Sequence, residues 1–330
     1  MNLLEEIRAR IFNIRDEKDF NDLAIKVFRF QAGSNPVYRE FIRLLRIDPL
    51  SISDIAMIPF LPVSFFKDHE IISGQQEGIG KVFTSSGTTG AVPSHHYISD
   101  LSLYEESFNS AFRFFYGDPC RYRFLALLPG YLEREGSSLV YMIDYLVRKT
   151  LKNGSGFFLH DFKTLESELL HPPENIRTVL FGASFALLDF SEAYAPDLSK
   201  VIIMETGGMK GRRDEMIREE LHAILCRRFN SRSVHSEYGM TELLSQAYSS
   251  GKGIFRCPPW MKILIRDTND PLEIIPPGHS GGINIIDLAN LYSCSFIATQ
   301  DLGKLHPNGS FEVLGRFDDS DIRGCNLLVV

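Results

Sequence analysis

One short segment of the sequence combines hydroxyl side chains with glycine, the residue types that can surround a phosphate group. It reads Thr84-Ser85-Ser86-Gly87-Thr88-Thr89-Gly90 and directly follows two apolar residues. Glycine lets the main chain turn its N–H groups toward an anion, and hydroxyl groups add donors without burying a fixed charge. The lysine and the spacing of a Walker A loop are absent. The segment therefore predicts another kind of phosphate loop, with a plain surface turn as the alternative.

A second segment with chemical potential is Gly182-Ala183-Ser184-Phe185-Ala186, which lies between an apolar strand pattern and a further apolar run. Gly-x-Ser-x-Ala in this setting is similar to the nucleophile elbow of serine hydrolases. A triad also needs an acid and a histidine. Several acids and histidines follow Ser184, and the sequence does not decide between them: Asp189, Asp214, His235, His279 and His306. A serine hydrolase or acyltransferase that uses Ser184 is therefore an alternative class of enzyme.

Charge and cysteine content limit the other kinds of chemistry. The 330 residues include 35 Lys plus Arg and 42 Asp plus Glu, a net charge of -7. This charge offers no general basic field for nucleic acid. The five cysteines are odd in number and scattered, without a close pair that would bind zinc. We expect a reducing, cytoplasmic setting, no nucleic-acid partner, and oxygen ligands for any metal.

The segments that must position these residues follow the pattern of a layered α/β fold. The first part has apolar residues at helical spacing, and we expect a helical segment over residues 1–75. Short apolar runs then alternate with helical patterns in a core over 76–315. From about residue 260, strand patterns follow one another and predict a β-rich subdomain. The expected strands are 82–84, 124–128, 157–159, 178–181, 201–204, 233–236, 261–266, 283–288, 295–299 and 311–314, and the expected helices are 104–115 and 214–229.

The sequence gives no sign of export or of membrane insertion. Two carboxylates follow two leucines near the start, where an export signal needs a basic region and an apolar stretch. No run approaches the ~18 consecutive apolar residues of a membrane-spanning helix. We therefore expect a cytoplasmic protein without membrane insertion.

Three further segments resemble, in order, motifs of one superfamily. Tyr238-Gly239-Met240-Thr241-Glu242 is similar to its aromatic-Gly-x-Thr-Glu motif, and 299–303 to its TGDLG segment, with Gln300 in place of the usual glycine. Residues 315–319 with 322–324 are similar to its hinge motif. Together with the hydroxyl-rich loop, they make the chain resemble the acyl-adenylate-forming superfamily over nearly its full length. The stretch 128–139 is typical of the LuxE-type acyl-protein synthetases, near the phenylacetate-CoA ligases.

The resemblance implies that most of these motifs surround ATP. The loop Ser85 to Gly90 would hold the phosphates, while Gly207 and Gly208 would line the adenine opposite a stacked Tyr238. Asp301 would accept hydrogen bonds from the ribose hydroxyls. Arg316 would reach the ribose or a phosphate. The alternatives are a core tyrosine, a turn aspartate and a surface ion pair.

The same resemblance implies a metal and an acyl pocket. Thr241 would contact phosphate and Glu242 would hold Mg²⁺, which prefers carboxylate oxygen. The alternative for Glu242 is an acidic residue favoured in the first turn of a helix. The carboxylic acid would lie in an apolar site whose expected members are Phe181, Ser184, Phe185 and His235.

Most members of the superfamily continue after the hinge into a C-terminal domain that supplies a catalytic lysine. Only seven residues follow Arg323. We therefore expect an adenylate-forming core without this lid domain, with residues 316–330 as hinge remnant and tail. Mg²⁺ and the phosphate loop, Lys210, or a partner subunit would then neutralise the transition state.

The resemblance to the LuxE type implies a cysteine near the chain end as acyl acceptor, and Cys325 is the one in that place. An inert tail cysteine is the alternative. The sequence thus predicts ATP-dependent activation of a carboxylic acid, fatty or aryl, to acyl-AMP. The acyl group would pass to a thiol as a thioester, on Cys325, coenzyme A, an acyl-carrier protein or an acyl-reductase partner. A non-catalytic nucleotide-binding module is a third possibility.

Overall fold

One large sheet crosses the molecule, and its first part is parallel. The computed structural model describes residues 3–74, 78–85, 92–130, 134–207 and 216–317. Within the 13-stranded sheet, five neighbouring strands run parallel. In spatial order they are β5 (Gly156–Phe157), β4 (Tyr122–Leu127), β6 (Arg177–Ala183), β7 (Ile202–Thr206) and β8 (His235–Tyr238). All six residues of β4 are buried, as expected for a parallel strand covered on both faces.

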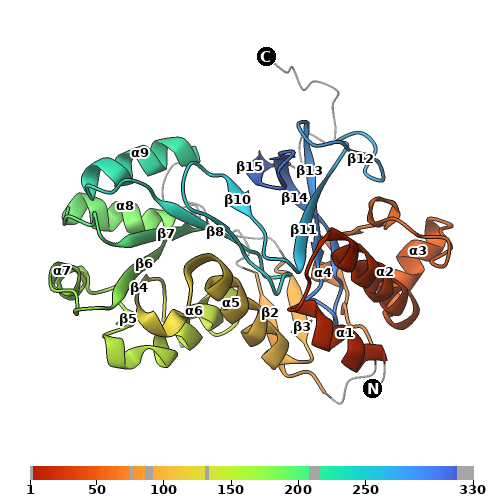
Figure 1. The fold of residues 1–330 in the computed structure, drawn as a ribbon, viewed down its shortest axis with the longest axis horizontal. Coiled ribbons are helices and arrows are strands. Elements are labelled where there is room, and N and C mark those ends of the chain that lie inside the picture. The colour runs from red at the N-terminus through yellow and green to blue at the C-terminus, as the bar shows by residue number, and fades with distance from the viewer. Residues whose placement is uncertain (1–2, 75–77, 86–91, 131–133, 208–215, 318–330) are drawn as a thin grey trace.

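The sheet continues from β8 into an antiparallel part. Each successive strand pairs antiparallel with its neighbour. In spatial order these strands are β9 (Ala247–Ser249), β10 (Phe255–Arg256), β15 (Phe311–Arg316), β14 (Phe296–Leu305), β13 (Ser280–Asp287), β11 (Met261–Arg266) and β12 (Ile274–Ile275). The short strand β1 (Leu61–Pro62) pairs in parallel with β14. The parallel and antiparallel parts therefore meet between β8 and β9 (Figure 1).

A separate two-stranded hairpin carries the ends of the predicted phosphate loop. It consists of β2 (Lys81–Thr84) and β3 (His95–Ile98), in which Phe83 pairs with His96. His96 and Ile98 are buried and alternate with partly exposed neighbours, so one face of β3 points into the protein.

Helices cover the sheet on both faces. In Figure 1, α8 and α9 lie on one side of the parallel strands and α5 and α6 on the other, while α1 to α3 lie beside the antiparallel part. The helices are α1 (Leu3–Ile11), α2 (Glu17–Ser34), α3 (Pro36–Leu44), α4 (Phe65–Asp68), α5 (Leu101–Tyr116), α6 (Ser138–Lys149), α7 (Phe162–Leu170), α8 (Ser184–Ala193) and α9 (Arg218–Arg228), with the 3-10 turns η1 (Ile55–Met57), η2 (Pro119–Arg121) and η4 (Leu151–Asn153). Side-chain caps fix several starts: Asp100 accepts from Ser102 N, and Ser137 from Val140 N. No helix among the described residues has the length and apolar character that crossing a bilayer needs.

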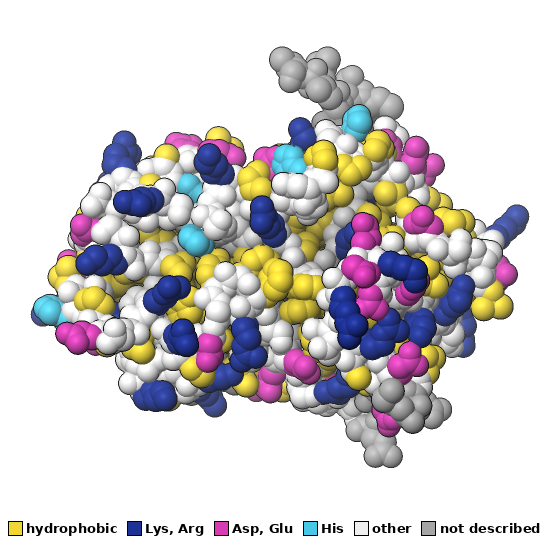
Figure 2. Space-filling model, in the orientation of Figure 1, with side chains coloured by type: hydrophobic (Ala, Val, Ile, Leu, Met, Phe, Trp, Pro, Cys, Tyr) yellow, Lys and Arg dark blue, Asp and Glu magenta, His cyan; other side chains and the backbone are white. Residues whose placement is uncertain are grey.

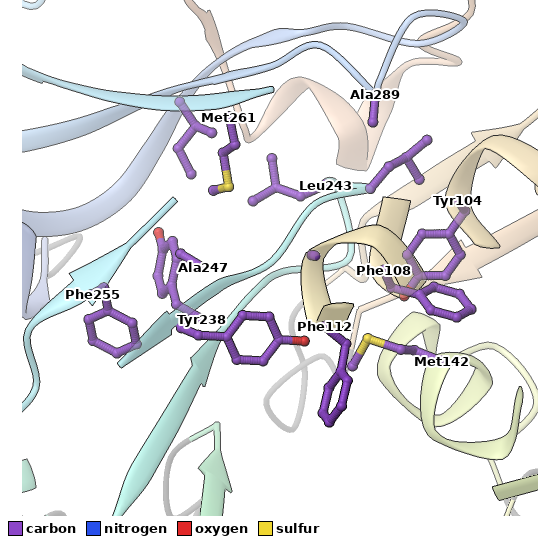
Figure 3. Close-up of a cluster of buried hydrophobic side chains, with 14 of the residues drawn as sticks. Tyr104, Phe108, Phe112, Met142, Tyr238, Leu243, Ala247, Phe255, Met261 and Ala289 are labelled. Atoms are coloured by element: carbon purple, nitrogen blue, oxygen red, sulfur yellow. The ribbon is translucent and has the colours of Figure 1, made fainter. Parts of the chain in front are cut away.

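Aromatic side chains fill much of the core. Figure 3 shows part of it, where Tyr104, Phe108 and Phe112 of α5 lie beside Met142 of α6. On the face in Figure 2, Lys and Arg side chains are interspersed with acidic and hydrophobic ones and form no continuous basic surface.

The predicted α/β fold class is confirmed, but some boundaries were wrong. The strand expected at 295–299 continues to Leu305 because β13 and β15 pair with it on both sides. The predicted ribose motif is therefore part of β14. The helix expected from 214 begins at Arg218, since residues 216–217 are not helical. All described elements after residue 260 are strands, and they belong to the same sheet as the parallel strands. The division of the chain into domains stays a prediction.

Candidate active site

The aromatic-Gly-x-Thr-Glu motif and the ribose motif meet in space. Tyr238 is the last residue of β8, and Asp301 lies in β14. The Tyr238 hydroxyl donates to Asp301 Oδ2 over 2.7 Å, and Arg316 Nε donates to Asp301 Oδ1 over 3.1 Å. Asp301 is 6% exposed, whereas the Arg316 side chain is 73% exposed. Three residues predicted to bind one nucleotide thus form a single cluster at the boundary between the two parts of the sheet.

The Tyr238 ring is held by two other aromatic rings. Phe255 and Phe311 meet it edge to face, with centroids 5.9 Å and 5.6 Å away. Burial, and then the nearby charge of Asp301, raise the pKa of Tyr238 well above its ordinary value. The hydroxyl is therefore a proton donor to Asp301 at all physiological pH values. Adenine stacking by Tyr238 stays a prediction.

Gly239 follows Tyr238 and lies close to the Glu237 side chain. A Cβ atom there would lie 2.5 Å from Glu237 Oε1. The other oxygen of Glu237 accepts a 2.5 Å hydrogen bond from the Thr206 hydroxyl on β7. A side chain at position 239 would therefore require this carboxylate to shift.

The base of the hydroxyl-rich loop is closed by paired serines. Ser85 N donates to Ser94 O over 3.1 Å, and Ser94 N donates to Ser85 Oγ over 2.8 Å. Beside them, Thr84 N donates to the carbonyl of Gly136 over 2.7 Å. The other predicted members, Ser86, Gly87, Thr88, Thr89 and Gly90, lie outside the described residues.

Glu242 is a buried carboxylate beside this closed base. It is 5% exposed, and burial raises its pKa, an effect reduced by a hydrogen bond with the Ser94 side chain. Such a group favours a nearby cation because a positive charge restores its ionised form. The described residues contain no group of three acidic, histidine or cysteine side chains for a metal. Mg²⁺ commonly uses one or two carboxylates together with substrate phosphates, so a single hard oxygen donor fits it.

His96 and Asn290 contact the main chain of the Thr241–Glu242 segment. His96 Nδ1 lies 2.8 Å from the carbonyl oxygen of Thr241, and its Nε2 lies 3.0 Å from Asn290 Oδ1. Asn290 Nδ2 donates to the carbonyl of Glu242 over 2.8 Å. Burial lowers the pKa of His96 to about 4. His96 is fully buried.

Asp287 holds the residues that follow Glu242. Its carboxylate accepts from Leu244 N at 2.8 Å and from Ser245 N at 2.9 Å, and also from the Ser245 hydroxyl at 2.5 Å. Burial raises its pKa to about 6 despite these bonds. Sequence reasoning missed both Asp287 and Asn290, because strand patterns do not reveal which distant loop a strand end contacts.

Ser184 has the surroundings of a structural serine. It begins α8, is 3% exposed, and donates to Glu205 Oε2 over 3.1 Å and to the carbonyl of Gly207. A hydrolase serine would instead donate to histidine. Its bonding therefore does not favour the hydrolase alternative. It also fixes Gly207, a predicted neighbour of the adenine.

The predicted acyl-site residues lie on strands β6 and β8 and on helix α8. Phe181 of β6 and Phe185 of α8 are 3% and 5% exposed. His235 begins β8, and its Nδ1 lies 3.1 Å from the Tyr116 hydroxyl. Burial lowers the pKa of His235. Their contact with an acid stays a prediction. Gly208, Lys210 and Cys325 lie outside the described residues.

Comparison with known proteins shows which family the chain is similar to. Residues 10–107 match the family described as acyl-protein synthetase, LuxE. A long-chain-fatty-acid–luciferin-component ligase of Vibrio harveyi is 21% identical over 339 residues, which cover 96% of this chain and 89% of that protein. The resemblance to the LuxE-type acyl-protein synthetases is confirmed.

Solved structures show the fold of this chain independently. A 2-hydroxyisobutyryl-CoA ligase in complex with 2-HIB-AMP has a TM-score of 0.65 and 12% identity, covering 94% of this chain and 70% of its own. ATP-bound MatB from Rhodopseudomonas palustris has a TM-score of 0.56 and 17% identity, covering 74% of this chain. This chain spans about half the length of MatB, with 49% covered. The fold is that of the adenylate-forming ligases.

Proposed function

We propose that this LuxE-type chain is a ligase that activates a carboxylic acid with ATP and passes the acyl group to a thiol. The cluster of Tyr238, Asp301 and Arg316 carries the proposal, because two motifs 63 residues apart share one hydrogen-bonded carboxylate. Glu242 lies four residues after Tyr238, beside the closed base of the phosphate loop. These are the parts that a mononucleotide needs: a ribose acceptor, a phosphate loop and an acidic group for the metal.

In the first half-reaction, a carboxylate oxygen of the acid attacks the α-phosphorus of ATP. The bond to the β-phosphate breaks, and pyrophosphate leaves with the electron pair. Asp301 would orient the ribose through its hydroxyls, and the donors of the loop at Ser85 would hold the phosphates. Mg²⁺, when bound, would neutralise phosphate charge, and Glu242 is the residue that would hold it.

In the second half-reaction, a thiolate attacks the acyl carbon and AMP leaves. The acceptor would be Cys325, an acyl-carrier or acyl-reductase protein, or coenzyme A. The name of the Vibrio harveyi relative refers to long-chain fatty acids, which supports a fatty acid as substrate. The buried Phe181 and Phe185 support an apolar acyl group in the same way.

Exchange of labelled pyrophosphate into ATP tests the first half-reaction. We expect exchange that depends on an added acid, and a panel of fatty and aryl acids would identify the substrate class. Asp301→Ala should reduce it by about 100-fold or more, because oriented polar groups in a site contribute on that scale. Asp22→Ala is the control, since Asp22 pairs only with Lys18 on the surface.

Two other results would contradict the proposal. ATP binding without exchange for any acid would favour a non-catalytic nucleotide-binding module. Covalent labelling of Ser184 by a fluorophosphonate probe would favour a hydrolase.

A further inference from the structure

The inner face of β3 connects the phosphate-loop hairpin to the Thr241–Glu242 segment. Ser94 and His96 are two residues apart, so their side chains point to the same side of an extended chain. They are 4% and 0% exposed, whereas His95 and Tyr97 between and after them are partly exposed. Ser94 hydrogen-bonds the Glu242 carboxyl group, and His96 contacts the carbonyl of Thr241. Ser94 and the adjoining strand β3 thus hold both the side chain and the main chain of this motif.

Asn290 completes the connection from the antiparallel part of the sheet. Its side chain contacts His96 Nε2 at 3.0 Å and donates to the carbonyl of Glu242 at 2.8 Å. His96 and Asn290 are 0% and 1% exposed. Polar groups so deeply buried cost free energy unless they are hydrogen-bonded, and each of these two side chains contacts one of two consecutive carbonyls. These contacts therefore fix where the Thr241–Glu242 main chain lies relative to β3.

The Thr241 carbonyl can only accept, so His96 donates to it from Nδ1, and the neutral ring then has no proton on Nε2 for Asn290 Oδ1, which lies 3.0 Å away. Phe66 packs edge to face against the ring, with centroids 5.6 Å apart, and leaves it little freedom to rotate. The imidazole is thus a rigid spacer of fixed direction between β3 and the motif.

We propose that His96 is a positioning residue that sets where the Glu242 carboxylate lies relative to Ser85 and Ser94 at the base of the loop, and thereby the coupling between ATP and Mg²⁺. The inference rests on the proposed function, because it takes the loop and Glu242 as the binding sites of phosphate and metal. His96 itself contacts neither ligand. Its effect should therefore appear in how strongly Mg²⁺ enhances ATP binding, rather than in the binding of ATP alone.

Isothermal titration of the full chain with ATP, with and without Mg²⁺, tests this coupling. His96→Phe keeps the ring shape and removes the hydrogen bond to the Thr241 carbonyl. We expect the enhancement of ATP affinity by Mg²⁺ to fall about tenfold, the effect of losing roughly one hydrogen bond. The affinity without Mg²⁺ should change less than about twofold, because the loop itself is untouched. His171→Phe, which alters a surface histidine bonded only to its own helix, should leave both affinities unchanged.

Conservative variants separate positioning from general loss of structure. His96→Asn places an amide donor where Nδ1 lies, and it should restore most of the Mg²⁺ enhancement. Asn290→Ala breaks the same connection from the other side, and should reproduce the His96→Phe pattern even if the β3 variant folds poorly.

The outcomes distinguish the inference from the function on which it rests. An unchanged Mg²⁺ enhancement in both His96→Phe and Asn290→Ala would overturn the inference while leaving the proposed function intact. An equal loss of ATP affinity with and without Mg²⁺ would also overturn it. A wild-type chain that binds no ATP would overturn the proposed function, and the inference with it.

Discussion

The parallel and antiparallel parts of the sheet each bury a carboxylate near a strand end, and the two carboxylates have different partners. Glu205 of β7, in the parallel part, lies 3.0 Å from Arg218 Nε and 3.6 Å from His222 Nε2. Burial alone would raise its pKa, but His222 and Arg218 outweigh burial and lower it. Asp287 of β13, in the antiparallel part, has neutral donors from Leu244 and Ser245, and its pKa rises to about 6.

The different partners of Glu205 and Asp287 show two ways in which a buried carboxylate can hold a loop beside a binding site. In the parallel part, an ion pair ties α9 to β7, and Ser184 links the same carboxylate to Gly207. In the antiparallel part, main-chain N–H groups tie the residues after Glu242 to Asp287. An ion pair compensates the burial of charge, whereas neutral donors do so incompletely.

Asp287→Asn should produce the largest change in pH dependence. Below pH about 4, Asp287 is protonated in both the folded and the unfolded chain. Between about 4 and about 6 the folded chain keeps a proton that the unfolded chain has released, so the free energy of unfolding falls as pH rises. The pKa shift from 3.8 to about 6 corresponds to roughly 3 kcal/mol. Urea unfolding at several pH values should show the variant gaining stability relative to wild type by about this amount over that window.

Glu205→Gln is the matched comparison and should act in the opposite direction. A carboxylate with a lowered pKa contributes stability above its unfolded pKa of about 4.5, and this contribution is lost as pH falls further. The destabilisation by Glu205→Gln should therefore be greatest at neutral pH and shrink in acid. If both variants differed from wild type by a constant amount at every pH, the contrast between the two carboxylates would be wrong.

Glycine-to-alanine substitutions compare the same two parts of the sheet. We expect their effects on the free energy of unfolding to be smaller than those of the carboxylate variants. A Cβ at Gly303 in β14 would lie 2.6 Å from the main-chain oxygen of Glu312 and 2.5 Å from Ile283 Cδ1. At Gly182 in β6 the nearest atoms are side-chain atoms, Leu187 Cγ at 2.9 Å and Leu127 Cβ at 3.1 Å, and no main-chain atom is among them. We expect Gly303→Ala to cost about 2 kcal/mol in the free energy of unfolding and Gly182→Ala about 1 kcal/mol.

Gly315→Ala is the control for both glycine variants, since nothing lies within 4 Å of a Cβ there. It should change the free energy of unfolding by less than about 0.5 kcal/mol. Equal costs for Gly303→Ala and Gly315→Ala would mean that the close approach of β14 and β15 is not constrained at this point.

The sequence was enough to predict the α/β fold and the grouping of Tyr238, Asp301 and Arg316. Apolar runs reveal buried strands, and the resemblance to the acyl-adenylate-forming superfamily implied that one nucleotide contacts all three. The extension of β14 through Asp301 was missed, because polar and glycine residues there read as a loop. Pairing on both sides of that strand overrides the local preference.

The connections of His96 were also beyond the sequence. They join residues 145 and 194 positions apart. Local periodicity carries no information about such contacts, and a histidine beside a phosphate loop is equally compatible with a surface position. Burial decides between these interpretations, and burial follows from how the hairpin packs on the large sheet.

A crystal structure with a non-hydrolysable acyl-sulfamoyl adenosine, an analogue of acyl-AMP, tests the central claim most directly. Our account predicts ribose hydroxyls within about 3.2 Å of the Asp301 carboxylate, the adenine beside Tyr238 and the sulfamoyl group near Thr241 and the loop that begins at Ser85. An analogue bound away from Asp301, with these residues untouched, would contradict it.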